Sequence, residues 1–250
     1  MKKLLLLVIS LALFTSCQLN EEITFHKNGS GEYKLAVDMS GFMAMAKGMD
    51  QEKDSLTEKK EPLVKDTVYK LADMLSDKKD SIAHLPKEER ELLESMKNVV
   101  VKIHADEMKG EMTMAYIYPF KKTSDLENIL EKFEKIEKNR KDKNDIMTDM
   151  SNGLPKTKVS YNFSKRKFHR KVKLIKTEKK KDSINKDSKE KEAMLGMFKY
   201  KLIYHFPYTI KSVSYKDALL SADRKTLIIE VPIDKMINNP TLLDFEVKFD

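Results

Sequence analysis

The sequence predicts an α+β protein: a curved antiparallel sheet built of hairpins, with helices packed on one face and a disordered charged insertion. Three observations predict this class. Apolar residues alternate along several pairs of neighbouring segments, which is typical of strands with one buried face. Between these pairs lie stretches in which apolar residues recur at helical spacing. The chain carries no glycine-rich fingerprint between a strand and a helix, such as dinucleotide-binding parallel sheets have.

The first hairpin has the clearest pattern. Ile23 and Phe25, and then Tyr33, Leu35 and Val37, alternate on the two sides of an Asn–Gly turn. The same pattern predicts further hairpins over 99–118 and 159–174, and strands over 198–206, 210–213, 227–233 and 243–249. Helical spacing predicts helices over 40–49, 63–75, 86–96 and 124–136.

The domain plan follows from composition. Of the 250 residues, 40% are hydrophobic and 35% are charged. We expect a signal peptide over 1–16, a tether over 17–22, and a single α+β domain over 23–250. Residues 137–156 are polar and predict a linker. Residues 176–192 contain one apolar residue, Ile184, and cannot bury enough surface to offset their ordering entropy, so they predict the disordered insertion.

The leader sequence predicts export. Lys2 and Lys3 precede an apolar run over 4–14, and the small residues Thr15 and Ser16 follow it. These are the three regions of a secretory signal peptide. The apolar run is too short for a membrane-spanning helix, which needs about 20 residues.

The residues Phe14-Thr15-Ser16-Cys17 resemble the lipobox of bacterial lipoproteins. The resemblance implies that Cys17, the only cysteine, becomes the mature N-terminus and carries a diacylglyceryl thioether and an N-acyl chain such as palmitate. The alternative is a plain secretory signal with a free Cys17. No aspartate follows Cys17, and Glu21-Glu22 is similar to the acidic export signal of Bacteroidota surface lipoproteins, or forms an ordinary acidic tether. We therefore expect an outer-membrane location.

A second resemblance covers both ends of the domain. The turn over 28–31 between two strands, and Phe206-Pro207, Ser212-Val213 and the turn over 221–226, are similar to LppM-like bacterial lipoprotein domains. The resemblance implies an α+β domain that engages lipid or an envelope glycolipid. The insertion over 176–192 departs from that family, and no binding residue is carried over.

The basic charge of the chain lies in one segment. The net charge is +8, whereas residues 156–181 hold twelve lysines and arginines against one glutamate, or +11. Because the chain is exported, an anionic membrane surface is a nearer partner than nucleic acid. The alternative is a solvated face without a partner. The candidate contacts with the anionic surface are Lys165, Arg166, Lys167, Arg170, Lys171 and Lys173.

No catalytic, metal-ligating or cofactor-binding residue is predicted. The five histidines have no metal-ligand spacing, and the sequence contains neither a nucleophile elbow nor a phosphate-binding loop. A methionine group fits flexible core filling, an adaptable contact surface or, less simply, copper(I) ligation. Its members are Met39, Met43, Met45 and Met49.

We therefore expect a lipid-anchored envelope protein without catalysis, whose domain binds a lipid, an envelope component or a partner protein. One alternative is an unrecognised hydrolase, which would gather carboxylates or histidines from different segments into one pocket. Another is a structural spacer, which would have no pocket.

Overall fold

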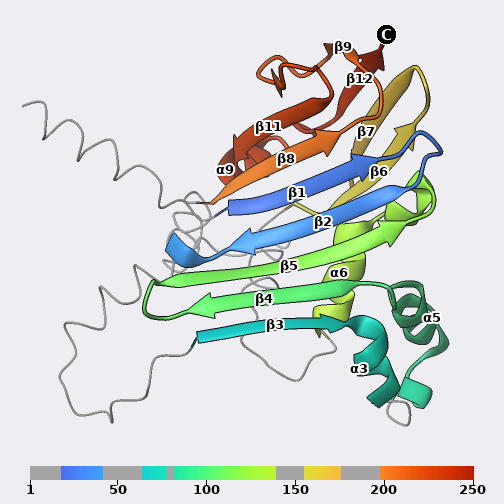
Figure 1. The fold of residues 1–250 in the computed structure, drawn as a ribbon. Coiled ribbons are helices and arrows are strands. Elements are labelled where there is room, and N and C mark those ends of the chain that lie inside the picture. The colour runs from blue at the N-terminus through green and yellow to red at the C-terminus, as the bar shows by residue number, and fades with distance from the viewer. Residues whose placement is uncertain (1–17, 42–63, 78–81, 139–154, 176–197) are drawn as a thin grey trace, which may run out of the picture.

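The computed structural model describes residues 18–41, 64–77, 82–138, 155–175 and 198–250, and two sheets dominate it (Figure 1). The larger sheet consists, in spatial order, of β10 (Leu219–Leu220), β11 (Thr226–Pro232), β8 (Lys199–His205), β1 (Gln18–Phe25), β2 (Gly31–Asp38), β5 (Glu111–Phe120), β4 (Val100–Asp106) and β3 (Val64–Lys70). The smaller sheet consists of β6 (Thr157–Phe163), β7 (Lys167–Leu174), β12 (Phe245–Phe249) and β9 (Ile210–Val213).

Short helices lie between the strands. They are α3 (Leu71–Asp77), α5 (Lys87–Ser95), the 3₁₀ turn η1 (Thr123–Leu126), α6 (Ile129–Lys138) and α9 (Ile233–Asn238). Among the described residues, no helix combines the length and the apolar character that a membrane crossing requires.

The three predicted hairpins are confirmed. In the first, Gly29 has a φ of +84°, and the Asn28 side chain accepts a hydrogen bond from the Ser30 amide at 3.1 Å. Gly31 follows, and a Cβ there would lie 1.9 Å from the Thr24 carbonyl oxygen. Only glycine fits this close approach of two strands, so the turn fixes the β1–β2 register.

The prediction of one antiparallel sheet is wrong in two respects. The larger sheet is mixed, because β1 pairs in parallel with β8 over Gln18–Thr24. The β6–β7 hairpin belongs to the second sheet, where β7 pairs with β12. Alternation along a strand indicates which face is buried, but it does not specify the neighbouring strand or its direction.

The helix predicted over 63–75 is also corrected. Val64–Lys70 forms the edge strand β3, which pairs with β4 along its whole length, and only Leu71–Asp77 is helical. Val64 and Val68 have helical spacing, yet both are exposed on the strand. Pairing with β4 therefore decides the conformation of this segment.

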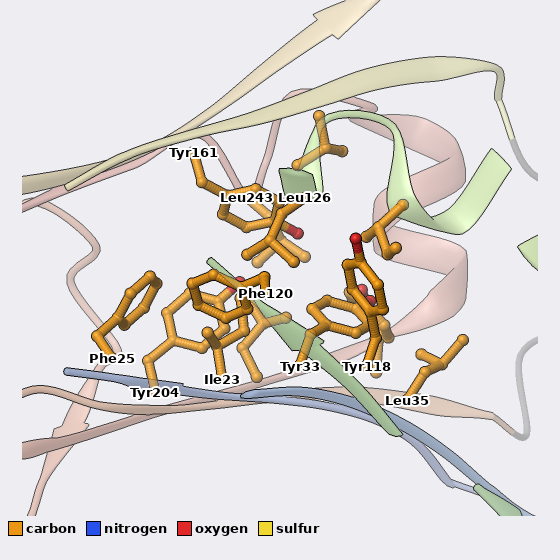
Figure 2. Packing of buried hydrophobic residues seen from close by; sticks show 14 of the residues in the cluster. Ile23, Phe25, Tyr33, Leu35, Tyr118, Phe120, Leu126, Tyr161, Tyr204 and Leu243 are labelled. Atoms are coloured by element: carbon orange, nitrogen blue, oxygen red, sulfur yellow. The ribbon is translucent and has the colours of Figure 1, made fainter. Parts of the chain in front are cut away.

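The cover of the larger sheet is shared between helix α6 and the smaller sheet. Phe133 of α6 packs 5.1 Å from Tyr116, measured between ring centroids. Phe168 of β7 packs 5.2 Å from Phe25 and 5.5 Å from Tyr204. Side chains of the larger sheet point toward Leu126, Tyr161 and Leu243 in the covering layer (Figure 2). A sheet covered by helices alone is not confirmed.

Two predicted boundaries change. β1 begins at Gln18, so the tether predicted over 17–22 is shorter, and the acids Glu21 and Glu22 belong to the sheet. Helix α6 extends to Lys138, and β6 begins at Thr157, so the polar linker is shorter than 137–156. The insertion predicted over 176–192 lies outside the described residues, as do Cys17 and three of the four methionines; Met39 is buried.

Candidate functional site: a buried carboxylate beside an apolar cavity

Glu21 lies on the covered face of the central strand β1. It shares that face with Ile23 and Phe25 because alternate residues of a strand point to the same side. Its side chain is fully buried. A buried carboxylate without partners would destabilise the fold by far more than one strand pairing stabilises it. The stability of the fold therefore depends on the groups that pair with Glu21.

Three tyrosine hydroxyls donate to this carboxylate. Tyr161 of β6 approaches Glu21 Oε1 at 2.9 Å, and Tyr204 of β8 donates to the same oxygen. Tyr200 of β8 donates to Oε2. Leu202 pairs with Glu21 across the parallel strands, so Tyr200 and Tyr204 flank it on the same face. The two sheets thus meet at one carboxylate.

Arg170 supplies the opposing charge from the smaller sheet. Its Nη2 lies 3.6 Å from Glu21 Oε2, its Nε donates to the Tyr204 hydroxyl at 3.1 Å, and its Nη1 donates to the Leu243 carbonyl at 3.1 Å. The side chain is only 3% exposed. Arg170 pairs with Tyr161 in the β6–β7 register, so both face the larger sheet.

The cluster shifts the acidities of its members. Burial, and then the charge of Glu21, raise the pKa of Tyr161, Tyr200 and Tyr204 well above the ordinary value. Burial acts most strongly and tends to lower the pKa of Arg170, but the charge of Glu21 and the neighbouring tyrosines together outweigh it and hold this pKa well above its usual value. The tyrosines therefore stay neutral and donate hydrogen bonds, and the arginine stays charged.

An apolar cavity of about 80 Å³ lies beside this cluster, between the two sheets. Arg170 and Tyr200 form part of its wall, and both have the protein partners described above. The remaining lining is almost entirely apolar: Leu19, Leu130, Pro155, Thr157, Val159, Val172, Ile233, Met236, Pro240 and Leu243. The cavity therefore offers apolar contact rather than a free charge.

A second, more open cleft of about 680 Å³ lies between α5 and the end of β5. Its carboxylates already have partners. Asp125 accepts hydrogen bonds from the Lys121 and Lys122 amides at 3.0 and 3.1 Å, and Glu94 is ion-paired with Lys97. These contacts stabilise a turn and the surface of α5. They do not favour the acid–base chemistry that a hydrolase needs.

The predicted anionic-surface residues separate in the structure. Lys165, Arg166, Lys171 and Lys173 are exposed, and Lys167 is ion-paired with Glu246 at 2.9 Å. Arg170 is a correction, because it is buried against Glu21 and cannot contact a membrane. The reason is strand alternation: on β7, Phe168, Arg170 and Val172 share the buried face.

Glu21 was missed as a core residue, although its position predicts burial. It lies two residues before Ile23 and four before Phe25, so the alternation that identified the strand also places Glu21 on its inner face. Because buried carboxylates are rare, an acidic pair close to Cys17 favoured a tether over a core position.

Histidines lie near carboxylates on the surface. His104 Nδ1 is 2.7 Å from Asp66 Oδ1 and its Nε2 is 3.3 Å from Glu111 Oε2, while His169 and His205 contact Asp244 and Glu22. Within the part of the chain that the structure describes, no group of three acidic, histidine or cysteine side chains is arranged to hold a metal ion.

The His104 contacts predict a measurable pH dependence. Hydrogen bonds that the imidazolium donates to Asp66 and then to Glu111 raise the pKa of His104, so the charged ring is favoured in the folded protein. This stabilisation is present below the ordinary histidine pKa and is lost as the pH rises through the raised value. NMR titration should give a raised midpoint for His104, and Asp66→Asn should lower it. An unchanged midpoint in that variant would rule out the contact.

Tyr33 and Tyr204 provide a matched pair of buried tyrosines. The Tyr33 hydroxyl is buried without a hydrogen-bond partner among the described residues, whereas the Tyr204 hydroxyl contacts both Glu21 and Arg170. We expect Tyr204→Phe to lower the free energy of unfolding by about 1.5–3 kcal/mol, and Tyr33→Phe to leave it unchanged or raise it. Urea unfolding tests this, and equal losses in both variants would contradict the assignment.

The sequence matches no protein-family model and no curated protein. Among solved structures, the chain is similar to the folded domain of the Mycobacterium tuberculosis LppM protein, determined by NMR. The two share 7% sequence identity, the match covers 94% of this chain and 89% of that chain, and the TM-score is 0.39. At this level the likeness assigns the chain neither to a family nor to a function.

Proposed function

We propose that the protein is a lipid-anchored, non-catalytic protein of the bacterial cell envelope whose domain binds an apolar ligand in the cavity between the two sheets. The observation that carries the ligand proposal is the lining of that cavity, where the polar side chains Arg170 and Tyr200 have protein partners. The lipobox-like residues before Gln18 support the anchor, and the outer membrane is the proposed location.

The size of the cavity limits the ligand. Pockets for drug-sized ligands measure about 300–1,000 Å³, so a cavity of about 80 Å³ takes a small apolar group or the end of an acyl chain. Displacing water from such a wall is favourable at about 25 cal/mol per Å² of apolar surface. A lipid that inserts the tip of one chain is the ligand class that fits both the lining and the proposed location.

The alternatives have weaker support. A hydrolase would need titratable groups free to act in an accessible cleft, and the carboxylates of Asp125 and Glu94 in the α5 cleft hold other contacts. A spacer without a ligand would need no cavity. Exposed Lys171 and Lys173 fit an additional contact with anionic headgroups.

The test is titration with a fluorescent fatty acid. Met236 lines the cavity, and its neighbour Ile237 in α9 does not; both are partly buried. We expect saturable binding by the natural chain, a strong loss of affinity in Met236→Trp because the indole fills the cavity, and nearly natural affinity in Ile237→Trp. Equal affinity in all three proteins would overturn the proposed binding site.

A further inference from the structure

One end of the two sheets lies next to the proposed anchor. Gln18, the first residue of β1, pairs with Asp38 at the end of β2 and with Lys199 at the start of β8. Cys17 directly precedes Gln18, and one extended residue spans only about 3.3–3.6 Å. If Cys17 carries lipid, this end of the sheets must lie at the bilayer surface.

Strand directions bring other segments to the same end, which we call the anchor end. Antiparallel pairing from β2 through β5 and β4 to β3 places the β4–β5 turn and the start of β3 there. In Figure 1, the starts of β1 and β3 and this turn all lie at the left. In the smaller sheet, Leu19 of β1 shares the cavity wall with Thr157 and Val172, so the start of β6 and the end of β7 also lie at the anchor end.

Exposed apolar side chains gather at the anchor end. Six large apolar side chains of the described residues are exposed, and four of them occur here: Val64, Met108, Leu174 and Ile175. Met108 is 74% exposed at the tip of the β4–β5 turn. Scattered exposed apolar residues need no explanation, but here four of the six lie at strand ends on the side of the anchor.

Three of these four apolar positions have an exposed lysine as a sequence neighbour. Lys65 follows Val64, and Lys173 precedes Leu174. Lys109 follows Met108, but its ammonium is ion-paired with Asp106 at 3.1 Å. A lysine can bury its aliphatic stem against apolar groups while its ammonium stays among lipid headgroups. Asp66, Glu107 and Glu111 lie at the same end, so insertion of the apolar tips, with lysine stems beside them, is the basis of a fit to the bilayer interface.

The basic turn of the β6–β7 hairpin lies at the opposite end. Phe163, next to that turn, stacks on Phe25, the last residue of β1, with ring centroids 4.8 Å apart. Eight strand residues span about 25 Å, so Lys165 and Arg166 are that far from the anchor end along β1. A domain held with its anchor end at the bilayer would point this turn away from it.

We propose that the anchor end forms a membrane-docking surface, with Met108, Leu174 and Ile175 inserted among the headgroups of the bilayer that holds the Cys17 lipid. This surface deepens the proposed function and depends on its lipid anchor. Docking in this way fixes the orientation of the domain, because the strands then meet the membrane at their anchor end. The cavity, whose lining includes Leu19, Thr157 and Met236, lies near the bilayer in this orientation.

The absence of tryptophan from the chain makes a clean test possible. Single variants Met108→Trp and Leu174→Trp place a reporter on the docking surface, and Leu219→Trp places one on an exposed residue of β10 as the matched control. The full lipidated chain is reconstituted into phosphatidylcholine–phosphatidylglycerol vesicles that contain doxyl-labelled lipid. We expect a blue shift and quenching for the first two reporters and neither for the control.

The possible failures are distinguishable. If the protein floats with the vesicles but all three reporters are quenched equally, or none is, the docking surface is wrong and the anchor stands. If the protein does not float, the lipid anchor and the docking surface both fail. Circular dichroism of each variant confirms that it folds, which the exposure of these side chains leads us to expect.

Discussion

Replacing Arg170 with methionine is expected to lower the free energy of unfolding by about 3–5 kcal/mol. The substitution keeps the aliphatic volume but leaves Glu21 as a buried carboxylate with no opposing charge. It also removes the donors to Tyr204 and the Leu243 carbonyl. Chemical unfolding of the purified domain measures the loss.

Two controls isolate the charge pair. Lys171→Met, on the same strand but exposed, should change stability by less than about 0.5 kcal/mol. Glu21→Gln combined with Arg170→Met should recover part of the loss, because no unpaired charge remains. The glutamine oxygen can still accept from Tyr161 and Tyr204, and its amide nitrogen can donate to the Tyr200 hydroxyl. If Arg170→Met costs no more than Lys171→Met, the two sheets are not held by this pair.

The second large effect concerns the anchor. We expect Cys17→Ser, combined with a cleavable secretory leader in place of residues 1–16, to move the protein from the membrane fraction to the salt-washed soluble fraction. Each buried methylene contributes about 0.8 kcal/mol, and two or more chains anchor stably where one binds marginally. Fractionation, with a mass spectrum of the N-terminal peptide, gives the answer. Equal membrane retention of this variant and the natural chain would contradict the lipid anchor.

The hairpins were predictable because their information is local. Alternation around Asn28–Gly29 is sufficient to define the first hairpin, and Gly31 fixes its register through contact with the Thr24 carbonyl. The division into two sheets was not predictable in this way. The parallel β1–β8 pair joins residues about 180 positions apart, and no local pattern specifies such a pairing.

The candidate site illustrates the same limit. The strands of Tyr161, Tyr200 and Tyr204 were predicted, but the convergence of their hydroxyls on Glu21 depends on how the two sheets pack. The basic run around Arg170 predicts a surface residue, whereas its parity with Phe168 and Val172 on β7 indicates burial. Along a strand, parity is the better guide to exposure than local charge.

The most direct test of the proposed function is mass spectrometry of material that copurifies with the natively isolated protein. We predict an apolar envelope component, with at least one acyl chain, in stoichiometric amount with the natural chain and with Ile237→Trp. It should be depleted in Met236→Trp, whose indole occupies the cavity. If the extract contains nothing above a detergent blank, or the same amount from all three proteins, the proposal that this cavity binds a lipid is contradicted.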